Sequence, residues 1–359
     1  MTAYKVLHLI DRNTPLDMLI QIGLLAGTGD RIVSIGPPPQ VPAGLNVRAV
    51  HEPIGSAVLC GLRLRSIARD AEVIHVWSPR AQRAGLAAAA GGSGRVLRSI
   101  SAVPCSAKAR ASLLRSFRSR SVTVTAPTRA ARDALIRAGL DASHVRVLPS
   151  AAGRIDGIPS RRKTMRAELG IPDDAVVLVA PDAMTRPANL NLAAWAHAIM
   201  QYAMDSQSWL LLPAGGPMER AVLVFARGAG FIESTVGPWP IDRLPDALAA
   251  ADVAMFLRAD DCGTSAVAAA MAAGLPIVAF DTPDVVECAG PAAMLTEART
   301  PRAAGQALLK LIEQPDLAER LRQASTRRAT EFAVDSIRQR LADIYSSLAT
   351  VSDVLERAC

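Results

Sequence analysis

The sequence has 359 residues, 50% of them hydrophobic and 20% charged, which is enough apolar material for packed cores and more length than one average domain needs. This composition excludes a disordered chain, and we expect neither a membrane-spanning segment nor a signal peptide from the apolar runs of the sequence. The net charge is +7, but basic residues dominate the first half and acidic residues the second. Because only 4% of the residues are aromatic, bases would find few stacking partners, so we expect no nucleic-acid partner.

Strand-like apolar runs alternate with helix-like runs from the beginning of the chain. The strand-like runs of the first half cover 4–10, 31–36, 72–77, 95–100, 121–126 and 145–149. After a loop-like stretch at 150–163, the second half repeats the alternation with runs at 175–180, 208–213, 252–257 and 275–280. Continuous apolar strands between helices predict parallel sheets covered on both faces, so we expect two doubly wound α/β domains.

Two glycine-containing stretches, 27–32 and 91–96, fall short of the dinucleotide fingerprint, so a nicotinamide cofactor is not expected. The five cysteines are scattered and never in Cys-x-x-Cys spacing, which predicts reduced thiols in a cytoplasmic protein. The histidines form no cluster with metal-ligand spacing, so no metal is expected either.

A polar cluster, Gly263, Thr264 and Ser265, stands between the run at 252–257 and an alanine-rich helical stretch. A helix N-terminus presents unpaired N–H groups and a positive dipole end, so this cluster could hold an anion such as a phosphate. It could equally be a plain helix cap, in which Thr264 or Ser265 accepts a backbone N–H.

Several motifs occur together in the second half: "MRAELGIPDDAVVLVA", "WLLLPAGGPMERAVLVFARGAG", "LPDALAAADVAMFL", "AAMAAGLPIVAFDTPDVVE" and "LIEQPDLAERLRQASTRRATEFAVDSI". In this order they resemble the carboxyl-terminal half of family 4 retaining glycosyltransferases of the GT-B fold, and the first half fits more loosely. The resemblance implies an acceptor-side domain at 1–160, a nucleotide-sugar-binding domain at 161–335 and a terminal helix at 336–359 that packs back on the first domain. It also implies a metal-independent, hexosyltransferase-type enzyme.

The donor-site residues depart from the family pattern. Where the family has two glutamates before an Ala-Met-Ala, this chain has Asp261 and Ala269. Where the family has an arginine and a lysine for the donor diphosphate, it has Ala183 and Ala188, which leaves Arg186 as the remaining cation. Asp261 is therefore a candidate for binding a sugar hydroxyl and Arg186 for binding the diphosphate, with an ordinary loop acid and a solvated arginine as the alternatives.

The remaining candidates also follow from the resemblance. Ser101 stands where the family often has a histidine near the reacting sugar, and His75 lies nearest the expected crevice, although a histidine that ends a buried strand is more often structural. Gly215 and Gly216 match a glycine-rich turn that either approaches the nucleotide or is only a tight turn. Glu287 matches a frequent glutamate of no assigned role.

Two functions remain open after these residues are weighed. One is a retaining glycosyltransferase that moves a sugar from a nucleotide-sugar donor to a sugar, polysaccharide or lipid-linked acceptor. The other is a degenerate GT-B protein that binds a nucleotide or a partner without sugar transfer; a nucleotide-sugar epimerase has weaker support. The segment 107–121, with Lys108, Arg110, Arg115, Arg118 and Arg120, predicts either contact with anionic lipid at the inner membrane face or an ordinary packed helix.

Overall fold

The computed structural model describes residues 4–39, 41, 45–50, 56–90, 95–101, 103, 111, 114, 122–186, 188–204, 207–213, 215–258 and 264–356. The chain divides into two units, the first made of Met1–Ser150 with Val334–Cys359 and the second of Ala151–Ala333. Each unit contains one sheet in which every strand pairing is parallel. The predicted α/β class with two doubly wound sheets is confirmed.

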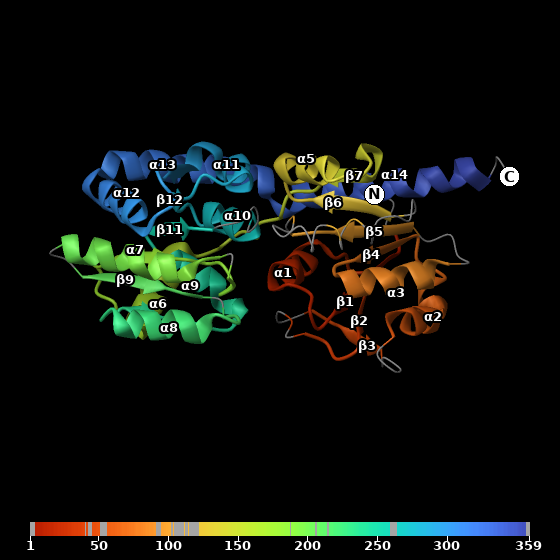
Figure 1. Ribbon diagram of the computed structural model, residues 1–359, viewed down its shortest axis with the longest axis horizontal. Coiled ribbons are helices and arrows are strands. Elements are labelled where there is room, and N and C mark those ends of the chain that lie inside the picture. The colour runs from red at the N-terminus through yellow and green to blue at the C-terminus, as the bar shows by residue number, and fades with distance from the viewer. Residues whose placement is uncertain are drawn as a thin grey trace. The chain divides into compact units, whose positions relative to one another are not determined.

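The first unit is built on a seven-stranded sheet of order β3-β2-β1-β4-β5-β6-β7. Its strands are β1 (Val6–Asp11), β2 (Arg31–Ile35), β3 (Arg48–Val50), β4 (Val73–Val76), β5 (Arg95–Ser99), β6 (Val122–Ala126) and β7 (Val145–Val147). Its helices are α1 (Leu16–Leu25), α2 (Ala57–Ala68), α3 (Pro79–Ala89), α5 (Arg129–Arg137) and α14 (Val334–Glu356) (Figure 1). The strand order reverses between β1 and β4, which is where ligands bind in sheets of this kind.

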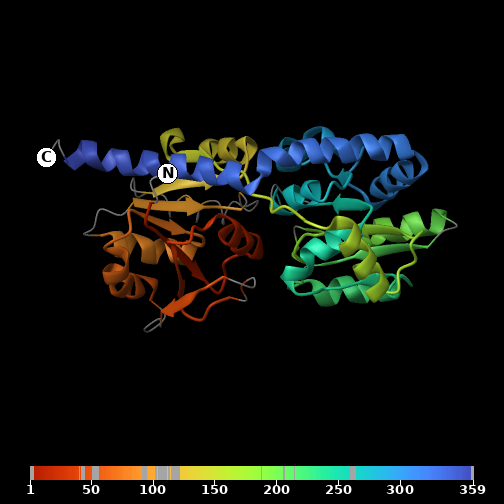
Figure 2. The ribbon, with the colours of Figure 1, turned by 180° about the vertical axis from the view of Figure 1, so that it is seen from behind.

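Alternation along the strands divides the core of the first unit between the two faces of the sheet. Leu7 and Leu9 of β1 pack with residues of α2 and α3, whereas Ile10 packs with α1. Helices α2 and α3 approach closely because Gly61 has no side chain. A Cβ at this position would lie only 2.3 Å from the carbonyl oxygen of Ala84. Helix α14 packs against α1 and β4, and Figure 2 shows it running along this unit. The face shared by α1 and α14 therefore receives the even-numbered side chains of β1.

The second unit has a six-stranded sheet of order β10-β9-β8-β11-β12-β13. Its strands are β8 (Val176–Val179), β9 (Ser208–Leu211), β10 (Thr235–Val236), β11 (Val253–Phe256), β12 (Ile277–Ala279) and β13 (Ala293–Leu295). Its helices are α6 (Ile158–Glu168), α7 (Leu190–Ala203), α8 (Glu219–Gly228), α9 (Leu244–Ala250), α10 (Thr264–Ala272), α11 (Pro283–Ala289), α12 (Pro301–Glu313) and α13 (Pro315–Ala329) (Figure 1). The order reverses between β8 and β11, so the switch point of this sheet lies there.

Two apolar clusters cover the two faces of the second sheet. One joins α7 and α12 to the sheet, and the other joins α6, α9, α10 and α13 to it. Arg166 of α6 is almost fully buried and donates to the carbonyl oxygens of Ala250, Pro172 and Ala175 and to the carboxylate of Asp252. These bonds fix α6 against α9 and the start of β11.

Helix α10 shows why the stretch after Ser265 is so rich in alanine. Val267, Ala268, Ala270 and Met271 are all fully buried in the core of the second unit. Small side chains let the helix lie close to the strands. Within the part of the chain that the structure describes, no helix is both long and apolar enough to span a membrane.

Candidate functional site

A buried ion pair marks the switch point of the second sheet. Asp182 follows β8 and Arg258 follows β11, and the guanidinium Nη1 of Arg258 lies 3.0 Å from the Oδ1 of Asp182. The side chains are only 8% and 5% exposed, for Arg258 and Asp182 respectively. The pair therefore joins the two loops that flank the switch point.

The loop after β8 is also fastened to the turn after β9. The N–H of Met184 donates to the carbonyl of Gly215, and the N–H of Met218 donates to the carbonyl of Met184. A Cβ at Gly216 would lie 2.6 Å from the carbonyl oxygen of Met184, a distance that no side chain tolerates. Gly216 thus permits a close backbone approach, here to the neighbouring loop, which favours the tight-turn interpretation of this motif.

The polar entry to α10 is described from Thr264 onward. Thr264 is buried and begins α10, Ser265 is half-buried, and the Thr264 carbonyl accepts a weak hydrogen bond from the thiol of Cys288. Asp261 and Gly263 lie outside the described residues. Their roles, and the choice between an anion site and a cap, stay predictions.

The cation predicted for the diphosphate and the two alanines beside it differ sharply in exposure. Arg186 is exposed, whereas Ala188 is fully buried among the apolar residues of α7 and α12 and Ala183 is half-buried. A lysine at position 188 would have to bury its stem in this cluster. The absence of a lysine there is consistent with the packing.

Glu287 lies in α11 and is half-buried. Arg328 of α13 donates to the carbonyls of Glu287 and Cys288, 2.7 and 3.1 Å away, and thereby satisfies the last carbonyls of α11. The backbone carbonyl of Glu287 thus takes part in the packing of α11 against α13.

Strand register assembles a polar network in the first unit. His8 and His75 are paired across β1 and β4 and lie on the face covered by α1 and α14, with their ring centroids 5.4 Å apart. Trp77 follows on the same face of β4, stacks on His75 at 4.1 Å and donates its indole N–H to His8. Both histidines are buried, so this network lies inside the unit.

Both nitrogens of His75 are hydrogen-bonded. Nδ1 lies 2.8 Å from the hydroxyl of Tyr345 in α14, and Nε2 lies 2.8 Å from the Oγ of Ser99. Ser99 is paired with Thr125 across β5 and β6, and their hydroxyl oxygens are 2.6 Å apart. Burial, with a smaller contribution from His8, holds the pKa of His75 well below its usual value, so the ring is neutral. The ring is fully buried and both of its nitrogens already have hydrogen-bond partners, so it cannot contact a substrate directly. The structural alternative therefore fits His75 better than a catalytic role.

A small cavity of about 30 Å³ lies at the carboxyl ends of the strands in front of this network. Trp77, Ser99 and Thr125 contribute to its lining, and so does Ser101, a residue singled out in the sequence. The structure thus brings Ser101 next to Ser99, with His75 directly behind Ser99. Two of the predicted catalytic residues therefore belong to one region, although only Ser101 lines the cavity.

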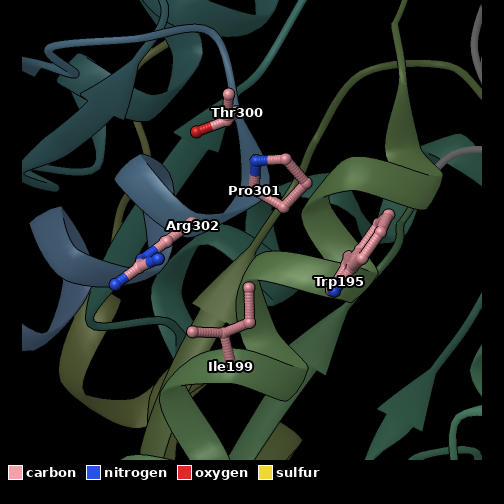
Figure 3. A pocket seen from close by; sticks show the side chains of 5 residues that line it. All are labelled: Trp195, Ile199, Thr300, Pro301 and Arg302. Atoms are coloured by element: carbon pink, nitrogen blue, oxygen red, sulfur yellow. The ribbon is translucent and has the colours of Figure 1, made fainter.

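A shallow apolar hollow lies elsewhere in the second unit, between α7 and the start of α12. Figure 3 shows its lining residues, Trp195, Ile199, Thr300, Pro301 and Arg302. None of these residues belongs to the loops that flank the switch point. We therefore do not include this hollow in the candidate site.

The sequence did not reveal Asp182, Arg258, Ser99, Thr125 or Tyr345 as site residues. Asp182 and Arg258 each follow a predicted strand of the second half, so the rule that ligands bind at carboxyl ends of strands could have found them. Tyr345 gave no such signal, because its partner His75 lies 270 positions away in the sequence.

Known proteins support the architecture and the class. Residues 183–314 match the sequence model of the family described as glycosyl transferases group 1, so the predicted resemblance to this group is confirmed. The fold is GT-B, shared with HepE of Anabaena in complex with UDP-glucose (TM-score 0.81, 17% identity, 96% of this chain and 100% of that chain). A glycosyltransferase of Rickettsia africae is similar with a TM-score of 0.78 at 12% identity, over 97% of this chain and 99% of that chain.

One curated relative adds sequence similarity. The D-inositol 3-phosphate glycosyltransferase of Streptomyces griseus subsp. griseus is 25% identical over 256 residues, which cover 63% of this chain and 50% of that protein. The chain therefore spans half the length of the curated relative that it matches. Membership of family 4 in particular stays a prediction.

Proposed function

We propose that the chain is a retaining, metal-independent glycosyltransferase that moves a sugar from a nucleotide-diphosphate sugar to a sugar, polysaccharide or lipid-linked acceptor. The observation that carries this proposal is the Asp182–Arg258 pair at the switch point of the unit that matches the group 1 family. Nucleotide ligands bind at such switch points in doubly wound sheets. UDP is the first nucleotide to test, since HepE of Anabaena has a structure in complex with UDP-glucose.

The donor diphosphate would bind at the carboxyl edge of the second sheet. The start of α10, with Thr264 and Ser265, would offer N–H and hydroxyl donors to the phosphates, and the exposed Arg186 would supply a positive charge. Asp182 and Arg258 would hold the two flanking loops in register. This assignment makes the donor site a property of the second unit alone.

The transfer itself needs little side-chain chemistry in this scheme. The bond between the anomeric carbon and the diphosphate oxygen breaks, and a new bond forms to the acceptor oxygen on the same face of the sugar. The acceptor proton passes to the departing diphosphate. The protein mainly stabilises the leaving charge and excludes water.

A specific observation keeps binding without transfer as a second candidate. Positions 188 and 269 are both alanine, so neither offers the charged side chain that the resemblance implies. Ala188 is fully buried and Ala269 is partly buried. Such a protein would bind a nucleoside diphosphate and would leave the sugar in place.

One experiment separates the two candidates. Purified protein is titrated with UDP by calorimetry and then incubated with UDP-glucose and a panel of sugar and lipid-linked acceptors, and the anomeric configuration of any product is read by NMR. The transferase proposal expects binding and a product of retained configuration, whereas binding without turnover for any acceptor would favour the second candidate. Arg186→Ala should weaken UDP more than uridine, because uridine has no phosphate charge.

Cytoplasmic location and contact with the inner membrane face stay predictions. Most of the segment 107–121 lies outside the described residues. Binding of the protein to vesicles that contain anionic lipid tests the membrane contact. If the contact exists, an Arg115→Glu/Arg118→Glu variant should bind these vesicles more weakly than the wild-type protein.

A further inference from the structure

The buried network of the first unit has a defined hydrogen-bond direction. His75 is neutral, so only one of its two nitrogens carries a proton. Among the described residues, the only hydrogen-bond acceptor for the Tyr345 hydroxyl is the Nδ1 of His75. If Nδ1 carried the proton, the buried phenol would have no acceptor, which is unfavourable. Tyr345 therefore donates to Nδ1, and the proton of His75 is on Nε2.

This direction continues through Ser99 to the cavity. The Nε2–H of His75 donates to the Oγ of Ser99. The hydroxyl proton of Ser99 is therefore not donated to the imidazole and remains available for another acceptor. The bond between Ser99 and Thr125 uses one of their two hydroxyl protons. No described residue accepts the other proton, and both residues line the cavity. The cavity therefore presents one hydroxyl donor to whatever occupies it.

The size and charge of the cavity define its occupant. Its volume of about 30 Å³ suits a group of the size of a water molecule, such as one hydroxyl or hydroxymethyl group. Among the described residues that line it there is no lysine, arginine or histidine, whereas Asp17 is one of them. These described residues offer a phosphate or carboxylate no countercharge, and Asp17 would repel it if ionised, so they favour an uncharged group.

We propose that this cavity is a subsite for one uncharged hydroxyl or hydroxymethyl group of the acceptor, and that Tyr345 and His75 are positioning residues that act through Ser99 and Thr125. The identification of the ligand as a sugar acceptor rests on the proposed function, whereas the binding of an uncharged hydroxyl group does not. It assigns a chemical class to a site in the first unit and gives the carboxyl-terminal helix α14 a part in it through Tyr345.

The first test reads the proton directly. In the full chain labelled with ¹⁵N, long-range NMR correlations identify which nitrogen of His75 is protonated, with His75→Gln for assignment. We expect the neutral form with the proton on Nε2 at pH 7. A proton on Nδ1, or an imidazolium, would overturn the direction that we infer.

The second test reads the subsite with glycerol, the simplest neutral probe that carries hydroxymethyl groups. The indole N–H signal of Trp77, which lines the cavity, should shift on titration with glycerol and stay unchanged with inorganic phosphate. Ser99→Ala/Thr125→Val removes both hydroxyl protons and should weaken glycerol binding about tenfold, whereas Thr125→Ser should keep it. No shift in the wild-type protein, or equal binding by the double variant, would overturn the subsite.

UDP binding, measured on the same variants, separates this proposal from the proposed function. The double variant lies in the first unit and should bind UDP like the wild-type protein. If UDP fails to bind any form of the protein, the proposed function fails while the glycerol titration still decides the subsite. If UDP binds normally and the double variant keeps its glycerol affinity, the subsite alone is wrong.

Discussion

The guanidinium of Arg258 and the carboxylate of Asp182 meet 3.0 Å apart at the ends of two neighbouring strands, with both side chains almost fully buried. The strands, β11 and β8, are the pair at which the order of the second sheet reverses. A buried pair of this kind is weak evidence for stability, because desolvation offsets much of the attraction. Its value here is that it fixes the two loops that we assign to the donor site.

Breaking this pair from one side should be costly. Arg258→Gln removes the guanidinium that pairs with the buried Asp182 carboxylate, so we expect the free energy of unfolding of the second unit to fall by about 3–5 kcal/mol. The apolar double variant Arg258→Met/Asp182→Leu should recover most of that loss. Urea unfolding measures both. As a control, Asp281→Asn breaks the exposed pair with Arg299 and should change stability little. Equal stability of Arg258→Gln and wild type would contradict the account.

A methyl group at Gly216 should disturb the loop after β8. The new Cβ in Gly216→Ala would lie 2.6 Å from the carbonyl oxygen of Met184, so one of the two backbone segments must move. We expect lower stability and weaker UDP binding, measured by thermal unfolding and calorimetry. The matched control is Gly228→Ala in α8, where a Cβ meets no atom within 4 Å. The expectation fails if both variants behave alike.

The stability of the second unit should fall in mild acid because of His197. Burial lowers the pKa of His197 to about 4, although a hydrogen bond with Ser208 partly opposes this. The unfolded chain, with a histidine pKa of about 6.5, then binds more protons than the folded chain between pH 6.5 and 4. The free energy of unfolding therefore decreases as the pH falls through this window, by roughly 3 kcal/mol from this residue.

Chemical denaturation of wild type and His197→Gln at pH 7.0, 6.0 and 5.0 isolates this contribution. The wild-type protein should lose more stability than the variant over this range, because glutamine does not titrate. Parallel pH profiles of the two proteins would show that His197 is not responsible. His75 acts in the same direction in the first unit, since burial lowers its pKa too.

Cys288 should be unreactive in the folded protein. Burial raises the pKa of its thiol to about 12, so almost no thiolate is present at neutral pH. Iodoacetamide at pH 7.5 should leave Cys288 unmodified in the native protein and alkylate it in denaturant, as read by peptide mass spectrometry. Modification at the same rate in both states would show that α11 does not pack as described.

The architecture was predictable from the sequence because fully buried parallel strands are continuous apolar runs. The runs at 72–77 and 252–257, for example, contain β4 and β11. The entry and body of α10 were predictable for a similar reason, since Thr264 begins the helix and the alanines face the core. Local patterns of this kind do not depend on distant parts of the chain.

The polar sites were less predictable because they depend on contacts between distant segments. The environment of His75 is completed by Tyr345, which no local pattern connects with it. Arg258 likewise gains its meaning only when β8 and β11 become neighbours and bring Asp182 to it. The sequence directed attention to Arg186, whose motif is local, and the structure shows that side chain to be exposed.

Thermal unfolding in the presence of nucleoside diphosphates and nucleotide sugars tests the central claim, a nucleotide-sugar site in the second unit, most directly. A ligand at a hundred times its dissociation constant stabilises the folded state by about 2.7 kcal/mol, which corresponds to several degrees in Tm. We predict such a shift for the diphosphate and sugar nucleotides of one base, with UDP tested first, in wild type and in Ser99→Ala/Thr125→Val, and a smaller shift in Gly216→Ala. If no nucleotide in the panel raises Tm, or if Gly216→Ala responds like wild type, the account of the donor site is contradicted.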